Sequence, residues 1–236
     1  ICSDMFSFPL IKNCRIIGNA GPHGGGGIRG GGIVDNCIIS GNFARSGGGL
    51  EHVWSITNST ISGNTASEGS GVSGAMVITN CRITGNSAGG VVLSDQGDIS
   101  NCIITGNSGW GVGLSGEGDI TNCTFAGNGG PHARALVGSD SSIAESKISN
   151  CIFQNGGIGL IGRCGIPEAT LSYSNVRGGG GHEGRYLDFP GKGNIDADPC
   201  FADPGYWDPN GTPEDANDDF WIESEGDYHL KSQGGR

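Results

Sequence analysis

Apolar and polar residues alternate around an asparagine that recurs about every 22 residues along most of the chain. An aliphatic residue lies two positions before each of these asparagines, and Ile or Phe usually lies three positions after it. Alternation with period two on both sides of the asparagine predicts two short β-strands in each repeat. The recurring asparagines are Asn13, Asn36, Asn58, Asn80, Asn101, Asn122 and Asn150.

A single repeat of this length cannot bury its own apolar side. Stacking the repeats places each aliphatic residue on its equivalent in the next turn, about 4.8 Å away, and encloses a continuous core. The leucine pattern of leucine-rich repeats is absent, and WD and kelch repeats are about twice as long. The sequence therefore predicts an all-β fold, a right-handed parallel β-helix solenoid of about eight coils with an irregular acidic C-terminal tail.

The asparagine of each repeat predicts a bend, because asparagine tolerates the left-handed backbone conformation. Stacked asparagine side chains would form an asparagine ladder. We expect Asn58 and Asn122, which also begin Asn-x-Ser/Thr sequons, to be buried in that ladder, so that only the sequon at Asn210 would be accessible. A cysteine follows most of the asparagines, and Ser59 replaces it once. This favours reduced thiols packed in the core over a metal or redox array.

The repeat covers residues 1–176, which we assign to the β-helix, and residues 177–236 form a C-terminal extension. The extension holds 13 of the 24 acidic residues and 5 of the 13 basic ones. Because a disordered tail is poor in aromatic residues, we expect this one to fold back on the helix. Cys164 and Cys200 could form a disulfide that ties the tail to the last coils. The aromatic residues of the tail are Phe201, Tyr206, Trp207, Phe220, Trp221 and Tyr228.

The net charge of −11 argues against nucleic acid as a partner. No apolar run is long enough to predict a transmembrane segment. The chain begins at Ile1 without a methionine or a basic leader, which we interpret as a mature or trimmed chain.

The repeat I-x-N-C-x-I-x-G-N, followed by residues 193–199 and 226–230, resembles secreted right-handed parallel β-helix repeat proteins of planctomycetes and other environmental bacteria. The segment 203–211 is a specific part of this resemblance. The resemblance implies export, and hence an extracellular or cell-surface location. It implies no single activity, because some proteins of this type resemble polysaccharide lyases or glycosidases and others are surface or adhesive proteins.

Two acidic residues occupy equivalent positions in adjacent repeats, three residues before the asparagine. Asp98 and Asp119 would lie about 5 Å apart, a separation that suits a retaining glycosidase pair or a calcium site. The alternative is that both are ordinary acidic turn residues, since no Arg or His accompanies them in the repeat. Trp54 or Trp110 would line a sugar-binding groove beside them, or would simply pack on the flank.

The tail concentrates oxygen-bearing side chains and is the better candidate for a metal site. Calcium prefers such ligands and would reduce the repulsion between the carboxylates. The spacing and terminal glutamate of an EF-hand are missing, so solvated acidic loops are the alternative. The candidate ligands are Asp196, Asp198, Asp203, Asp208, Asn210, Asp215, Asp218 and Asp219.

Two functional hypotheses follow from these features. The first is a non-enzymatic extracellular structural protein, a rod that serves as a surface, adhesive or matrix element and self-associates through its coil ends into filaments. The second is a carbohydrate-active enzyme or carbohydrate-binding module of the polysaccharide-lyase-like type. An enzyme requires acids and bases that converge on one face, whereas a rod does not.

Overall fold

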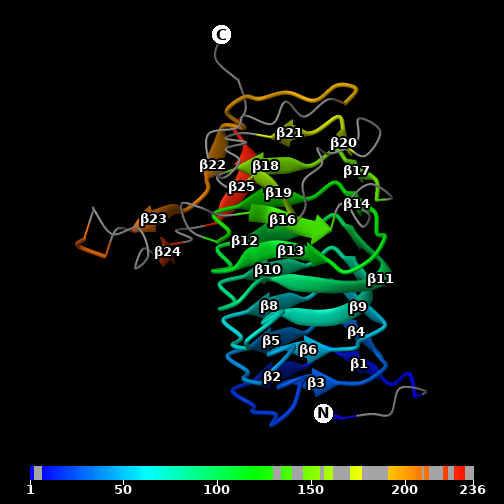
Figure 1. The fold of residues 1–236 in the computed structure, drawn as a ribbon. Helices are drawn as coiled ribbons and strands as arrows, with labels where there is room; N and C mark the ends of the chain where they lie inside the picture. Colours follow the sequence, from blue (N-terminus) through cyan, green and yellow to red (C-terminus); the bar gives the residue numbers. More distant parts are fainter. Residues whose placement is uncertain are drawn as a thin grey trace.

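The computed structural model describes residues 1–2, 7–129, 134–139, 146–154, 157–161, 171–176, 191–208, 210–212, 220–222 and 226–231. Within these ranges the chain consists of strands, turns and bends, with no helix. Strands that follow one another by one repeat pair in parallel, and Figure 1 shows the resulting stack of turns. The all-β parallel solenoid predicted from the repeat is confirmed.

Two faces of the solenoid come from the strands on either side of the bend asparagine. We call the strands before it the first face and the strands after it the second face. The first face contains β1 (Leu10–Lys12), β4 (Ile33–Asp35), β7 (Ser55–Thr57), the C-terminal parts of β9 (Val72–Thr79) and β11 (Val91–Ser100), β14 (Ile120–Thr121), β17 (Ile148–Ser149) and β20 (Leu171–Ser172). The second face contains β2 (Arg15–Ile17), β5 (Ile38–Ser40), β8 (Thr60–Ser62), β10 (Arg82–Thr84), β12 (Ile103–Thr105), β15 (Thr124–Ala126), β18 (Ile152–Gln154) and β21 (Asn175–Val176).

A third face closes each turn, so the expectation of two strands per repeat was wrong. These strands follow the glycine runs, and their buried residues Ile28, Leu50 and Val72 are aligned from turn to turn. Because glycine is neither clearly apolar nor polar, the glycine runs before these strands hide the alternation that would predict a third strand. The third face contains β3 (Ile28–Arg29), β6 (Leu50–Glu51), the N-terminal parts of β9 and β11, β13 (Trp110–Leu114), β16 (Arg134–Ser139) and β19 (Gly157–Ile161).

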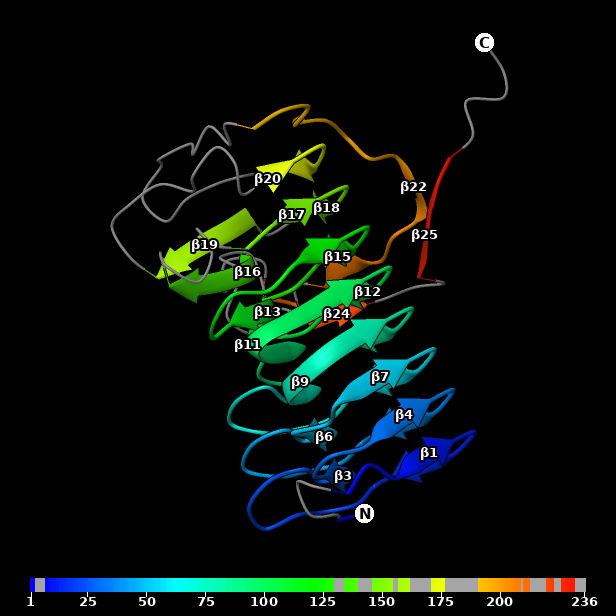
Figure 2. The same ribbon diagram turned by 90° about the vertical axis from the view of Figure 1, so that its right-hand side faces the viewer.

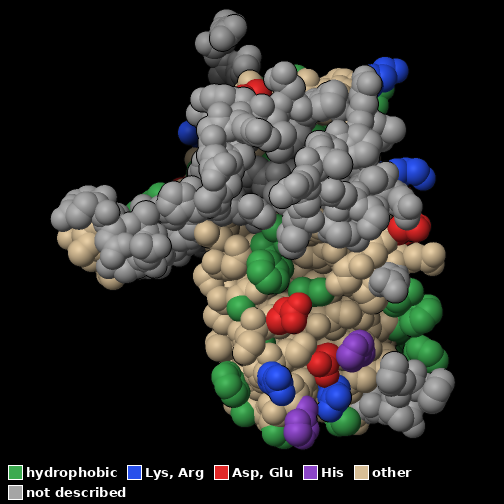
Figure 3. Space-filling model, in the orientation of Figure 1, with side chains coloured by type: hydrophobic (Ala, Val, Ile, Leu, Met, Phe, Trp, Pro, Cys, Tyr) green, Lys and Arg blue, Asp and Glu red, His purple; other side chains and the backbone are tan. Residues whose placement is uncertain are grey.

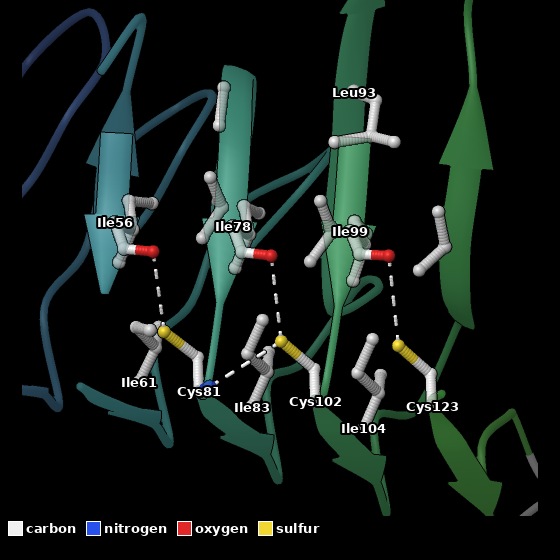
Figure 4. Packing of buried hydrophobic residues seen from close by; sticks show 14 of the residues in the cluster. Ile56, Ile61, Ile78, Cys81, Ile83, Leu93, Ile99, Cys102, Ile104 and Cys123 are labelled. Atoms are coloured by element: carbon white, nitrogen blue, oxygen red, sulfur yellow. Dashed lines mark hydrogen bonds between the residues drawn. The ribbon is translucent and has the colours of Figure 1, made fainter. Parts of the chain in front are cut away.

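The core is a set of vertical files of aliphatic side chains. Ile61, Ile83 and Ile104 are consecutive partners in the second face, and each is fully buried. Figure 4 shows this file opposite the file of Ile56 and Ile78, with the cysteines between them. Equivalent residues therefore lie directly above one another, as the repeat predicted.

The bend asparagines adopt the left-handed conformation, with φ between 50° and 55° from Asn13 to Asn150. Their side chains point to solvent, however, and Asn58 and Asn122 are exposed. The expectation that these two residues are buried in the ladder was therefore wrong. A side chain at the convex bend faces outward, and only scattered amide bonds join this column, such as Asn122 Nδ2 to Asn101 Oδ1 at 3.2 Å.

The buried asparagine ladder is formed instead by the asparagine of each Gly-Asn pair. There the glycine takes the left-handed conformation, as at Gly85 with φ of 62°, and the next side chain turns inward. Asn86 Nδ2 donates to Asn107 Oδ1 at 2.9 Å and to the carbonyl of Ile61 at 3.3 Å. The buried ladder runs through Asn42, Asn64, Asn86, Asn107 and Asn128, and the exposed Asn19 ends it by donating to Asn42.

The C-terminal end of the stack is covered by residues 191–197. Ile195 exchanges backbone hydrogen bonds with Ser174 and Val176, both at 3.0 Å. Asn194 accepts from the backbone of Ser174 and donates to the carbonyl of Leu171. These bonds satisfy part of the edge that the last turn would otherwise expose.

The extension forms two antiparallel ribbons. β22 (Phe201–Asp203) pairs with β25 (Asp227–Leu230), and β23 (Tyr206–Asp208) pairs with β24 (Phe220–Ile222). Phe201 and Tyr228 of the first ribbon are buried against Ala126 of the second face. Figures 1 and 2 both place β22 and β25 side by side next to the upper turns, and Figure 1 shows β23 and β24 extending outward from the solenoid.

Candidate functional site

The two acidic residues predicted as a carboxylate pair join adjacent turns through the backbone. The backbone N–H of Asp119 donates to Asp98 Oδ1 at 2.9 Å, and the backbone N–H of Lys147 donates to Asp119 Oδ1 at 3.0 Å. Each carboxylate therefore satisfies a backbone donor of the next turn. This geometry favours the turn role over a catalytic pair.

Asp35 also connects turns on the first face. Lys12 Nζ lies 2.8 Å from Asp35 Oδ2, and Asn58 donates to Oδ1 at 2.9 Å. The hydrogen bond from Lys12, and then that from Asn58, lowers the pKa of Asp35 to about 2. The carboxylate is therefore held in its charged form over the whole neutral and mildly acidic range.

The third face carries a cluster of charged residues that the asparagine repeat does not predict. Glu51 is only 7% exposed, and Arg29 Nε lies 2.9 Å from Glu51 Oε2. The Arg29 N–H is not directed at this oxygen, which accepts no hydrogen bond and is shielded from solvent. The ring of His52 follows, with Nδ1 4.0 Å from the same oxygen. We call these three residues the Glu51 cluster.

Glycines make room for the Glu51 carboxylate. A β-carbon at Gly24 would overlap with the carboxylate, and one at Gly47 would lie 2.9 Å from the β-carbon of Glu51. Figure 3 shows Asp or Glu, Lys or Arg and His side chains gathered over the N-terminal turns. A carboxylate next to a cation and an imidazole can exchange protons or bind polar groups of a ligand.

A signal for this cluster is present in the sequence. Arg29 and Glu51 each follow the buried aliphatic residue of the third face, and they are aligned partners in β3 and β6. Opposite charges one repeat apart at the same position therefore predict an ion pair between turns. The asparagine that defines the repeat lies outside the third strand and so gives no signal for this pair.

Comparison with known families agrees with this architecture. A family described as "Right handed beta helix region" matches residues 67–183. Residues 67–183 therefore match a right-handed β-helix, in agreement with the stacked parallel strands of the structure. Its sequence matches no curated protein. The described part of the β-helix contains no helical segment of the length and apolar character needed to cross a bilayer.

The predicted metal ligands of the tail fall into two groups. Asp215, Asp218 and Asp219 lie outside the described residues. Among the described ones, no three His, Cys, Asp or Glu side chains are arranged to hold a metal ion. Asp198 and Asp208 each accept the backbone N–H of the residue two positions later, both at 2.9 Å. Asp196, Asp203 and Asn210 complete the described set, and the calcium site stays a prediction.

The cysteines of the β-helix core form a file of free thiols. Cys81 Sγ donates to the carbonyl of Thr79 at 3.2 Å. Figure 4 shows the backbone N–H of Cys81 donating to Cys102 Sγ at 3.4 Å. Its hydrogen bond to Cys102, together with burial, raises the pKa of the Cys81 thiol. The buried thiols are Cys37, Cys81, Cys102, Cys123 and Cys151. Packed, protonated thiols are what this geometry supports.

The remaining cysteines lie away from this buried file or at its end. Cys2 and Cys14 are exposed and free at the N-terminal end of the solenoid. Cys200 is also an exposed, free thiol. Its proposed partner, Cys164, lies outside the described residues, so the pairing stays a prediction.

The two tryptophans considered for a sugar groove lie on different faces of the β-helix. Trp54 precedes β7 of the first face, is half exposed and meets Phe8 edge to face at 5.8 Å. Trp110 begins β13 of the third face and lies against Gly89 and Gly113. The two indoles therefore do not line one groove with Asp98 and Asp119.

Proposed function

We propose that this protein is a non-enzymatic extracellular structural element, a rigid β-helical rod that acts at a surface or in a matrix. One observation carries the proposal: three of the charged side chains in the described turns contact the neighbouring turn. Lys12 pairs with Asp35, Arg29 pairs with Glu51, and Asp98 binds the backbone of the next turn. Side chains used in this way stiffen the stack.

The two ends of the rod favour a particular route of self-association. Residues 191–197 cover the C-terminal end through Ile195 and Asn194. Direct stacking of one end on another would require this segment to move. Assembly through the sides of the rod keeps it in place and therefore fits the geometry better.

Electron microscopy together with glycan-cleavage assays tests the structural role. We expect rods or chains of rods and no release of reducing or unsaturated sugar ends from uronate or neutral polysaccharides. Turnover of any such polymer that is lost in Glu51→Gln, with the fold retained by circular dichroism, would overturn the proposal.

The Glu51 cluster supports a second candidate, a carbohydrate-binding or carbohydrate-active protein. Glu51 is the charged residue that is buried most completely among the described side chains, and Arg29 and His52 adjoin it. Sugar hydroxyls donate to carboxylates and accept from arginine. Glycan-array binding that is weakened by Glu51→Gln but unchanged in Asp98→Asn would favour this candidate.

We also propose that calcium orders the acidic extension. Asp203 and Asp227 are partners on adjacent strands, where like charges repel, and a cation would relieve that repulsion. Calcium should then raise the melting temperature, because a ligand that binds only the folded state stabilises it. A melting temperature that is identical in calcium and in chelator would show that calcium does not bind the folded extension.

A further inference from the structure

The second face holds the ribbon β22–β25 through an arginine and an isoleucine on adjacent turns. The Arg82 guanidinium lies 5.9 Å from the centroid of the Tyr228 ring and donates to the carbonyl of Gly226 at 3.4 Å. Ile103, its partner in the next strand, packs against the cluster of Phe201 and Tyr228. A cation over an aromatic face beside an apolar contact therefore recognises an aromatic ribbon.

The first two turns repeat this pair of side chains. Arg15 and Ile38 are partners in β2 and β5, and they occupy the same outward position after the bend as Arg82 and Ile103. The surrounding sequence repeats as well, with Asn-Cys-Arg-Ile followed one turn later by Asn-Cys-Ile-Ile in both places. We call Arg15, Ile17 and Ile38 the N-terminal seat.

The N-terminal seat is uncovered, unlike its counterpart. Ile38 is 36% exposed, Ile17 is 47% exposed, and Arg15 is also exposed. Ile103, by contrast, packs against the buried rings of the ribbon. The same recognition chemistry thus occurs twice on one face, once occupied and once open.

The second ribbon, β23–β24, has the composition that such a seat recognises. Figure 1 shows it standing away from the solenoid, and we call it the arm. Tyr206 is 55% exposed, and an isolated two-stranded ribbon is marginally stable in water without a packing partner. Its cross-strand partners are Tyr206 with Ile222, Trp207 with Trp221, and Asp208 with Phe220.

We propose that the arm of one copy binds the N-terminal seat of a second copy. This inference rests on the proposed structural function and names the surfaces through which the rods associate. Charge favours the contact: residues 191–236 hold 11 acidic and 3 basic residues, whereas residues 1–60 hold 3 acidic and 4 basic ones. Each copy keeps a free arm or a free seat after binding, so the contact is heterologous and extends into open chains.

Sedimentation velocity over a range of concentrations tests the contact with two single variants. Ile38→Asp damages the seat, and Tyr206→Ser damages the arm. The wild-type protein should form a series of oligomers, and each variant should weaken association about 30-fold, the effect of losing a central interface residue. Ile33→Asp is the matched control, since Ile33 is 38% exposed but lies on the first face; it should associate like the wild type.

Mixing the two variants gives the sharpest result. The intact arm of Ile38→Asp can bind the intact seat of Tyr206→Ser, so an equimolar mixture should yield dimers that do not grow further. Thermal melts check that each variant is folded. Wild-type protein that stays monomeric, or oligomers that both variants leave unchanged, would overturn the inference. If the oligomers are unchanged in both variants, the rods associate through another surface and the proposed structural function is still supported. Glycan turnover, by contrast, would contradict the proposed structural function.

Discussion

The two asparagine columns of the solenoid have the same spacing and opposite environments. Asn80 marks the bend, adopts φ of 54° and exposes its side chain, whereas Asn86 lies six residues later with its side chain fully buried. At the bend the asparagine itself supplies the left-handed conformation. In the ladder Gly85 supplies it, and the asparagine supplies hydrogen bonds instead. One residue type thus serves as a backbone adapter in one column and as a buried polar network in the other.

Removing a ladder residue should have the largest effect. Asn86→Ala leaves the backbone N–H of Asn64 and the carbonyl of Ile61 without their partners. Each unsatisfied buried group costs about 1–3 kcal/mol, so we expect a loss of roughly 4 kcal/mol in the free energy of unfolding. Urea denaturation measures it. A loss no greater than that of Asn80→Ala would show that the two columns are energetically equivalent.

Changing a bend residue should cost less and should depend on the backbone. Asn80→Ala removes the short polar side chain that lets asparagine tolerate the left-handed conformation, and alanine costs about 1–2 kcal/mol there. The loss of the long amide bond to Asn58, at 3.4 Å, adds little. Asn80→Gly is the control and should stay within about 0.5 kcal/mol of the wild type, because glycine adopts this conformation freely. Equal losses in both variants would mean that the side chain, not the backbone, matters there.

The repeat predicts the bend asparagines correctly, but it places the buried ladder in the wrong asparagine column. The period fixed the stacked files of Ile61 and Ile83, and it identified the bend, because both depend only on local alternation and turn chemistry. It could not show which asparagine turns inward. That depends on whether the left-handed residue is the asparagine itself or the glycine before it, and both patterns contain Asn beside small residues.

The third face and its cluster were lost for a related reason. Ile28–Arg29 and Leu50–Glu51 are strands of two residues after glycine runs, too short for an alternating pattern. The surface that holds the ribbon β22–β25 was equally hard to predict. Its residues Arg82 and Ile103 occupy outward positions that any polar or apolar residue can fill. Such positions acquire meaning only when the ribbon that covers them is placed.

The cysteine column between the two asparagine columns should be more tolerant. Ser59 already replaces cysteine, accepts the backbone N–H of Cys37 at 3.0 Å and donates to Thr57. Cys102→Ser should therefore cost about 1 kcal/mol, since the hydroxyl can take the same two partners. Cys102→Ala, which removes the acceptor for the backbone of Cys81, should cost more. The reverse order in thermal melts would assign the thiol a packing role alone.

The smallest effect concerns Asp35, which accepts a hydrogen bond from the bend residue Asn58. The pKa of Asp35 is lowered from 3.8 to about 2, first by Lys12 and then by Asn58. A lowered folded-state pKa stabilises the protein above the ordinary value, and this stabilisation is lost as the pH falls from about 4 to about 2. Melting temperatures of the wild type and Asp35→Asn should therefore converge over that interval. Lys12→Gln removes the largest cause, so it should shrink the difference. A difference in melting temperature that does not change with pH would show that the Asp35 charge does not stabilise the exposed column of bend asparagines.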